Sequence, residues 1–183
     1  RSRCPVADRV RRGSGGFTVI DQGRPEDAAA LAEVHVASWR QAYAGLLPES
    51  FLAALDPADR VAGWEARLRG GAPAVLLDRD GDRLAGFASF GACRDADAGT
   101  DWGELEAFYY LEPYWGAGRA GALLRAALDS LRRERRRIVT LWVLRENARA
   151  IAFYRKHGFA FDGAEKIDAR RSVTLHERRM RLG

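Results

Sequence analysis

The feature that most constrains this chain is a glycine-rich loop that stands between a strand and a helix. Residues 104–111 are typical of a β-strand, and Gly-Ala-Gly-Arg-Ala-Gly follows at 116–121. Glycines let the backbone approach a ligand closely, and the amides at the start of a helix attract anions. The order strand, loop, helix therefore predicts either a phosphate site or a turn that only connects the two elements. The helix that follows carries its apolar residues on one stripe: Leu123, Leu124, Ala127, Leu128 and Leu131.

The loop lacks the defining residues of two common phosphate-binding motifs. No Gly-Lys-Ser/Thr closes it, so it is not a Walker A loop. No acidic residue ends a following strand about 20 residues further on, where a dinucleotide-binding fold needs one for the ribose. An anion site here would therefore depend on backbone amides.

The composition is that of one globular domain. The chain has 183 residues, of which 47% are hydrophobic and 30% charged. No apolar run approaches the roughly 20 residues of a membrane helix, and the N-terminus has no apolar signal region. Residues 1–16 carry Arg, Gly and Ser without periodicity. We therefore expect a flexible leader at 1–16 and a single domain at 17–183, with no membrane partner.

Cysteine spacing and charge narrow the function classes only slightly. Cys4 and Cys93 have neither metal-ligand spacing nor the number needed for a disulfide framework, so we expect a metal-free, cytoplasmic protein. The net charge of +5 is compatible with an anionic partner. The arginine run at 132–137 is interpreted as a solvated helix end that complements the helix dipole. Because no base-reading motif accompanies this run, nucleic acid is the least favoured partner.

Periodicity along the rest of the chain predicts alternating strands and helices, hence a mixed α/β or α+β fold. Apolar residues at helical spacing follow a proline and two acids at 25–27, which is a helix-start pattern. Two apolar runs flank Asp80-Gly81-Asp82, which predicts a hairpin. The expected strands are 17–20, 73–78, 84–91, 104–111, 138–143, 159–166 and 172–181, and the expected helices are 25–43, 48–55, 58–68, one after 121, and 147–157.

A second motif follows the strand at 138–143. It starts at Asn147 and ends in Phe153-Tyr154-Arg155-Lys156-His157-Gly158-Phe159. Together with the glycine loop it resembles the Gcn5-related N-acetyltransferase (GNAT) family, which has a Gln/Arg-x-x-Gly-x-Gly/Ala loop and, downstream, an Asn and a Phe-Tyr-x-x-x-Gly-Phe segment. Gly118 and Ala120 match that loop, whereas Trp115 occupies the Gln/Arg position and Arg119 the usually apolar one. The resemblance covers the element order over 17–181 and is motif-specific over 104–159.

The resemblance implies a fold and a cofactor. It implies a central, twisted, mostly antiparallel sheet flanked by helices, in which the strands at 104–111 and 138–143 diverge to hold acetyl-CoA. The pantetheine arm would then pair with the edge of the first strand, and the pyrophosphate would rest on the amides of 116–121. The expected cofactor-binding residues are Tyr109, Tyr110, Trp115, Gly116, Ala117, Gly118, Arg119, Ala120, Gly121, Asn147 and Tyr154.

The resemblance also implies direct attack of an acceptor amine on the thioester. Tyr154 would protonate the leaving thiolate, or it is a half-buried core aromatic. Asn147 fits the N-cap of its helix and, by resemblance, also a cofactor contact. Glu104 and Glu106 alternate onto one strand face, so either could be the base, or both are solvated edge charges. The resemblance favours Glu104.

The sequence gives the fewest signals for the acceptor site. Trp39 and Tyr43 lie one turn apart on the first helix, and by resemblance they would shape this site, unless they are core residues. The preferred function is acetyl transfer to a primary amine of a small molecule or peptide. An acyl-CoA-binding sensor without turnover and a basic nucleic-acid-binding domain are the alternatives, and a homodimer is a further candidate assembly.

Overall fold

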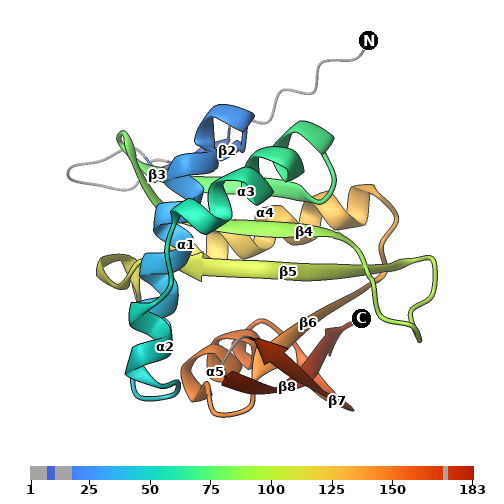
Figure 1. The fold of residues 1–183 in the computed structure, drawn as a ribbon. Helices are drawn as coiled ribbons and strands as arrows, with labels where there is room; N and C mark the ends of the chain where they lie inside the picture. Colours follow the sequence, from blue (N-terminus) through green and yellow to red (C-terminus); the bar gives the residue numbers. More distant parts are fainter. Residues whose placement is uncertain (1–7, 11–17, 171–172) are drawn as a thin grey trace.

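A computed structural model describes residues 8–10, 18–170 and 173–183, which form a mixed α/β fold around one sheet (Figure 1). The sheet has the strand order β1-β2-β3-β4-β5-β6-β8-β7. The strands are β1 (Asp8–Val10), β2 (Thr18–Gln22), β3 (Ala74–Asp80), β4 (Arg83–Ala92), β5 (Trp102–Tyr110), β6 (Ile138–Leu144), β7 (Ala160–Arg170) and β8 (Val173–Leu182). The helices are α1 (Ala28–Ala42), α2 (Glu49–Ala53), α3 (Ala58–Gly70), α4 (Arg119–Arg133) and α5 (Ala148–Lys156), with short 3₁₀ turns η1 (Pro25–Asp27) and η2 (Glu112–Tyr114).

The sheet divides between β5 and β6. Every other neighbouring pair of described strands is antiparallel, whereas β5 and β6 are parallel and pair only between 102–104 and 138–140. Beyond these residues the two strands separate, as Figure 1 shows. The predicted mostly antiparallel sheet with a splayed pair of strands is therefore confirmed.

A β-bulge in β5 lies where the two strands part. Ser89 of β4 faces Ala107, but Phe90 faces Leu105, so Glu106 is an extra residue without a partner. The bulge reverses the alternation of side chains along β5. As a result Ala107 and Tyr109 pack toward α1 and α3, and the core on the other face receives Leu105, Phe108 and Tyr110. The sequence pattern does not predict this bulge, because the register depends on the partner strand.

Helices cover both faces of the sheet. α1 and α3 lie across one face, where Leu31, Trp64, Leu77 and Phe87 form a buried cluster. α4 and α5 pack on the other face against β4, β5, β6 and β8. A third cluster, which includes Trp39, joins α1 and α2 to β6 and β8. This third cluster attaches the C-terminal part of the sheet to the N-terminal helices beside the splayed strands.

Local sequence signals account for most element ends. The β3–β4 hairpin turns at Gly81, whose φ of 60° is the left-handed conformation that the predicted Asp-Gly turn needs. Asn147 caps α5 as expected, because its Oδ1 accepts a hydrogen bond of 3.1 Å from the Ala150 amide. Among the described residues, no helix has both the length and the apolar character needed to cross a membrane.

Two strand ends differ from the prediction. Asp8–Val10 pairs with β2 as β1, although no element was expected within the predicted leader at 1–16; the rest of that leader lies outside the described residues. β7 continues to Arg170 rather than ending near 166. Its last residues pair with β8 through the backbone, and Ile167 is 68% exposed. Because pairing rather than burial holds this end, the hydrophobic pattern gave no signal for it.

Candidate active site

Two hollows meet at the point where β5 and β6 separate. The first, here called the strand cleft, has a volume of about 210 Å³ and lies between the diverging strands, the loop after η2 and α5. The second, the charged hollow, has about 220 Å³ and lies between β5 and the side chains of α1, α3, β6, β7 and β8. Glu106 and Tyr109 line both, as do Tyr43, Ala107 and Trp142. The bulge therefore stands at the junction of the two hollows.

The glycine loop presents unused amides at one end of the strand cleft. Gly116 and Gly118 adopt positive φ values of 76° and 77°, which reverse the chain after η2. Gly118 is the N-cap of α4 and has no side-chain cap, and the Ala122 amide bonds to its carbonyl at 3.4 Å. The first-turn amides before Ala122 have no intrahelical partner, since a helix leaves these groups unsatisfied. This end of α4 has the backbone chemistry of an anion site, and binding of an anion there stays a prediction.

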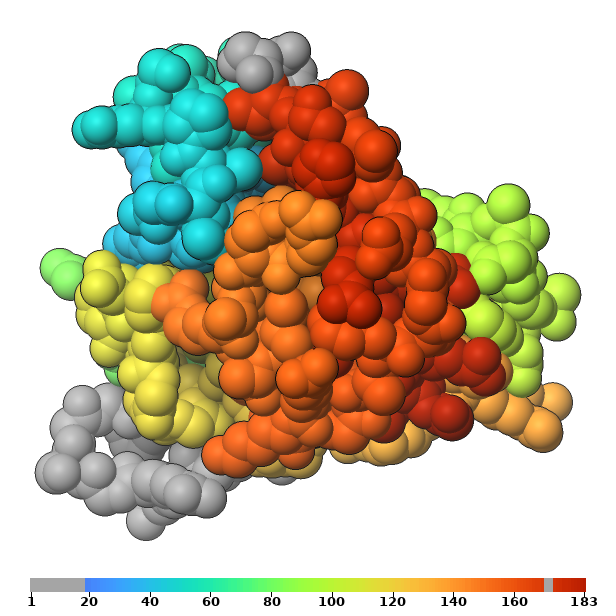
Figure 2. Space-filling model, turned by 90° about the horizontal axis from the view of Figure 1, so that it is seen from below, coloured from blue at the N-terminus to red at the C-terminus, as the bar shows by residue number. Residues whose placement is uncertain are grey.

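Trp115 folds back onto the strand that precedes it. Its indole nitrogen donates a hydrogen bond of 2.9 Å to the carbonyl of Tyr110. Its ring faces the strand cleft, and Arg149 of α5 lies over that ring. Figure 2 shows the corresponding surfaces, yellow after β5 and orange for α5, side by side. Trp115 therefore connects the loop to both walls of the strand cleft.

Arg119 directs its guanidinium away from the strand cleft and into the protein. Its Nε and Nη2 donate to the two carboxylate oxygens of Asp78 at 3.0 and 2.7 Å, and Nη2 also donates to the Arg79 carbonyl at 2.9 Å. Asp78 is fully buried and accepts a further hydrogen bond of 2.7 Å from the Tyr110 hydroxyl. Burial, followed by the negative charge of Asp78, raises the pKa of Tyr110 well above its usual value. Only the backbone of Arg119 remains for a ligand at the loop.

Tyr154 is the buried phenol of the strand cleft. It packs among Phe108, Phe153 and Phe159 and is 8% exposed. Within the described part of the chain its hydroxyl has no hydrogen-bond partner. Burial, with a smaller contribution from Tyr109, raises the pKa of Tyr154 well above 10. The hydroxyl therefore stays protonated at neutral pH and can donate a hydrogen bond into the strand cleft.

Asn147 keeps a donor for the strand cleft while it caps α5. The cap uses only its side-chain oxygen, and its NH₂ group bonds to none of the described residues. The side chain is nevertheless 6% exposed and lines the strand cleft. The predicted N-cap is confirmed, and the cofactor contact stays a prediction.

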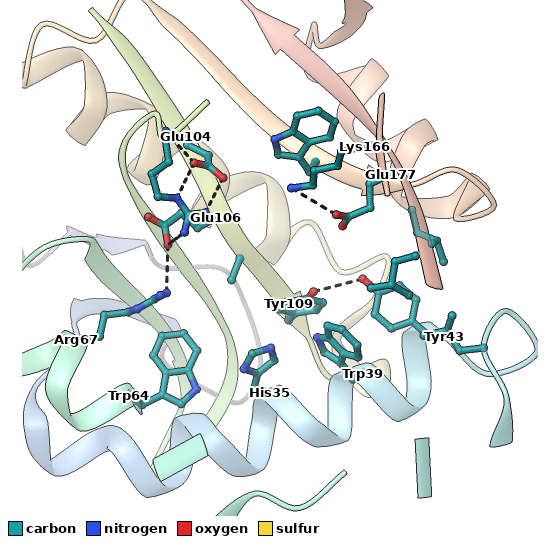
Figure 3. Close-up of a pocket in the computed structure, with 16 residues that line it drawn as sticks. His35, Trp39, Tyr43, Trp64, Arg67, Glu104, Glu106, Tyr109, Lys166 and Glu177 are labelled. Atoms are coloured by element: carbon teal, nitrogen blue, oxygen red, sulfur yellow. Dashed lines mark hydrogen bonds and ion pairs between the residues drawn. The ribbon is translucent and has the colours of Figure 1, made fainter. Parts of the chain in front are cut away.

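Aromatic rings form one wall of the charged hollow (Figure 3). His35 lies edge-on to Trp64, at 5.5 Å between ring centroids, and 5.2 Å from the ring of Tyr109. Tyr43 and Tyr109 bring their hydroxyls within 3.3 Å of each other. Burial, together with Tyr109, raises the pKa of Tyr43 well above its usual value. Trp39 and Tyr43, the two predicted acceptor residues, both line this hollow, and Trp39 is also a core residue at 5% exposure.

Glu104 is held by one arginine. Arg94, from the loop after β4, donates from Nε and Nη2 to the two carboxylate oxygens at 2.9 and 2.7 Å. The Arg94 amide adds a third hydrogen bond of 3.3 Å. The Glu104 side chain is 5% exposed. These bonds occupy both oxygens of the residue that the family resemblance favoured as the base.

Glu106 is held more loosely, although it lies beside Glu104 (Figure 3). It forms ion pairs of 3.2 Å with Arg67 and 3.6 Å with Arg94. Burial raises the pKa of Glu106 above its usual 4.5, against the attraction of the two arginines. A carboxylate with a raised pKa is the better proton acceptor near neutral pH.

Several residues of the charged hollow carry no signal in the sequence. Arg67 lies in the last turn of α3, where its guanidinium carbon is 5.3 Å from the Trp64 ring centroid. Arg94 occupies a loop between strands, and Lys166 pairs with Glu177 at 3.4 Å across β7 and β8. Each belongs to an element with no local motif, so only the fold brings them together.

Comparisons with known proteins agree with this architecture. A family model described as the acetyltransferase (GNAT) family matches residues 16–159. The chain is 33% identical over 141 residues to the uncharacterized N-acetyltransferase YuaI of Bacillus subtilis, which covers 77% of this chain and 79% of that protein. The structure of PaiA N-acetyltransferase from Thermoplasma acidophilum, solved with coenzyme A, superposes with a TM-score of 0.66 at 21% identity and covers 87% of this chain and 96% of that chain. YncA of Salmonella typhimurium, solved with its cofactor acetyl-CoA, gives a TM-score of 0.67 at 23% identity, with 90% and 92% covered. The chain belongs to the GNAT family of acetyltransferases.

Proposed function

We propose that this chain transfers the acetyl group of acetyl-CoA to a primary amine by direct attack. The strand cleft would hold the acyl-bearing arm, and the charged hollow would hold the acceptor. The observation that carries the proposal is that the two hollows meet at the β5 bulge, where Glu106 and Tyr109 line both. An amine in one hollow can therefore reach a thioester in the other without crossing a wall.

The strand cleft fits coenzyme A in two respects. After residue 104 no described strand pairs with the backbone of β5 on its β6 side, so an amide-containing arm can pair with it like an added strand. The N-terminus of α4 has no side-chain cap, so its backbone amides can donate hydrogen bonds to a pyrophosphate. Two related folds solved with coenzyme A or acetyl-CoA support the same ligand here. When bound, acetyl-CoA supplies an activated acyl carbon with a thiolate leaving group.

Glu106 is the base in this proposal, in place of Glu104. An acceptor amine must lose a proton before or during attack, and Glu106 combines a raised pKa with access to both hollows. Glu104 keeps Arg94 in place instead, through its paired hydrogen bonds. Arg94 and Arg67 in turn fix the position of the Glu106 carboxylate.

Tyr154 stabilises the leaving sulfur in this proposal. A thiol has an ordinary pKa of about 8.5, which lies below that of a buried phenol, so full proton transfer from Tyr154 is uphill. A hydrogen bond donated to the developing thiolate is favourable, because charge-assisted hydrogen bonds are the strong ones. The proton that the amine loses to Glu106 would then reach the sulfur after the bond breaks.

Turnover of acetyl-CoA with a panel of amines tests the proposal. The release of free thiol is followed spectroscopically for the wild type, Glu106→Gln and Glu33→Gln, a control on the exposed side of α1. Loss of a general base lowers turnover by about 10²–10⁴-fold. We expect this loss for Glu106→Gln, and we expect it to shrink as the pH rises toward the pKa of the amine. Wild-type rates at Glu33→Gln are the expected control.

Two outcomes would change the assignment. A Glu106→Gln variant with the pH–rate profile of the wild type would remove Glu106 as the base. No thiol release with any amine, together with no coenzyme A binding, would overturn the proposed function itself.

A further inference from the structure

The loop that would receive the phosphates of coenzyme A carries no cationic side chain directed at them. Its single basic residue is Arg119, whose guanidinium donates hydrogen bonds to Asp78 and to the Arg79 carbonyl. Trp115 occupies the position where the resembling family has Gln or Arg, and Glu112 adds a negative charge nearby. From the loop itself, only backbone amides would therefore face a strongly anionic ligand at this end of the strand cleft. Outside the loop, Arg125 of α4 places its Nη1 3.5 Å from where a Cβ on Gly121 would stand.

Arg149 reaches the same place from the opposite wall. It lies in the first turn of α5, lines the strand cleft, and places its guanidinium carbon 3.2 Å from the centroid of the Trp115 ring. At this distance the guanidinium lies flat on the indole, because an edge-on group would drive its N–H atoms into the ring. The five N–H donors of arginine lie in the plane of the group. Stacking thus fixes the charge and leaves its donor edge available.

No carboxylate of the described residues balances the charge of Arg149. Within the described residues no ion pair joins Arg149 to an acidic side chain, and its attraction to Glu112 acts only at longer range. Burial lowers the pKa of Arg149, although an arginine keeps its proton under these conditions. Among the described residues, Arg149 is therefore a partly desolvated cation without an ion-pair partner beside the glycine loop.

We propose that Arg149, stacked on Trp115, binds the phosphate groups of the cofactor and supplies the cationic contact that the glycine loop lacks. This inference rests on the proposed function, because it assumes that coenzyme A occupies the strand cleft. Trp115 acts as a positioning residue for Arg149: its indole is itself fixed by the hydrogen bond to the Tyr110 carbonyl. The pair joins the two walls of the strand cleft, which Figure 2 shows side by side.

Two phosphate groups of coenzyme A could meet this guanidinium, the pyrophosphate and the 3′-phosphate. Calorimetric titration of the wild type and Arg149→Gln with coenzyme A, 3′-dephospho-coenzyme A and pantetheine separates them. Arg155→Gln is the matched control, because Arg155 is an exposed arginine on the same helix whose guanidinium lies over Phe161. Hydrogen bonds to charged groups predict a loss of roughly 10- to 100-fold in coenzyme A affinity for Arg149→Gln.

The three ligands give distinct results. A loss with coenzyme A and dephospho-coenzyme A, but not with pantetheine, supports a pyrophosphate contact. A loss with coenzyme A alone supports a 3′-phosphate contact. Equal losses with all three ligands, or affinities within about twofold of the wild type, would show that Arg149 only packs on Trp115 and would overturn the proposal. Failure of the wild type to bind coenzyme A would instead contradict the proposed function.

Discussion

The strand cleft and the charged hollow share a boundary but are built in different ways. The strand cleft comes almost entirely from two continuous stretches, 105–120 and 142–154, with Ala42 and Tyr43 added from α1. The charged hollow takes its side chains from eight places: α1, the α1–α2 segment, α3, the β4–β5 loop, β5, β6, β7 and β8. One half of the site is thus a local structure, and the other is a product of the whole fold.

The two halves also treat charge differently. Beside the strand cleft, the buried pair of Asp78 and Arg119 points away from the ligand space and pins the start of α4 to β3. In the charged hollow, the pairs of Glu104, Glu106 and Glu177 with their basic partners lie in the wall itself. The first arrangement suits a ligand that is always the same, because backbone amides and apolar walls do not have to rearrange when it binds. Side-chain ion pairs can exchange partners, which suits an acceptor that brings its own charge.

The largest expected effect comes from breaking the buried pair beside the strand cleft. Arg119→Met leaves the Asp78 carboxylate buried with only the Tyr110 hydroxyl as partner. Removing one partner of a buried ion pair costs about 3–5 kcal/mol of unfolding free energy. Denaturant unfolding followed by circular dichroism measures this loss.

The double variant Asp78→Asn/Arg119→Met shows whether the uncompensated charge is the cause. Asn removes the charge and keeps an oxygen that can accept from Tyr110. We expect the double variant to be more stable than Arg119→Met alone. If the two variants unfold at the same denaturant concentration, the loss comes from packing of the Arg119 stem and not from Asp78.

The contrast between the two halves explains what the sequence could predict. The glycine loop and the cap at Asn147 follow from local patterns, whereas the divergent strands and the placement of Tyr154 in the strand cleft follow from the family resemblance over 104–159. The destination of Arg119 could not be predicted, because its partner Asp78 lies 41 residues earlier on another strand. The roles of Arg67 and Arg94 depend equally on long-range packing. The bulge at Glu106 depends on the register with β4, which a strand pattern does not contain.

Tyr154→Phe tests the proposed hydrogen-bond donor of the strand cleft. The substitution removes one oxygen and keeps a ring that packs against Phe108 and Phe159. Loss of a hydrogen bond to a charged sulfur predicts a fall in kcat of roughly 10- to 100-fold, with the affinity for coenzyme A nearly unchanged. Steady-state kinetics with an accepted amine, together with calorimetry, separates the two quantities. A kcat within about twofold of the wild type, below that range, would assign Tyr154 to the core alone.

Gly118→Val tests whether the strand cleft depends on backbone conformation. No atom lies within 4 Å of the added Cβ, so the strain comes from the φ of 77°, which a β-branched residue rarely adopts. Backbone strain of this kind costs about 1–3 kcal/mol, and relief by movement of the loop would displace its amides. We expect coenzyme A affinity to fall roughly tenfold in calorimetry.

Gly45→Val is the matched control for this change. Gly45 has a φ of 74° and an equally open Cβ, but it belongs to the segment between α1 and α2 and not to the glycine loop. A similar loss of stability with unchanged coenzyme A affinity is the expected result. Equal affinity losses in both variants would mean that general destabilisation, and not the glycine loop, weakens binding.

The smallest expected effect is a difference in stability that distinguishes Glu106 from Glu104. Because the pKa of Glu106 is raised above 4.5, the unfolded chain loses this proton at lower pH than the folded chain does. The contribution of Glu106 to the free energy of unfolding is therefore lost as the pH rises from 4.5 through the pKa of the folded state. Glu106→Gln has no group that titrates at this position, so this loss is absent from the variant. We therefore compare the free energy of unfolding of Glu106→Gln with that of the wild type, by urea unfolding at pH 4 and at pH 7. We expect the difference to move in favour of Glu106→Gln by less than about 1 kcal/mol between these two pH values. Glu104→Gln, which breaks the paired hydrogen bonds to Arg94, is expected to be less stable than the wild type at pH 7. A gain for Glu106→Gln that is the same at both pH values would contradict the raised pKa, and with it the choice of Glu106 over Glu104 as the base.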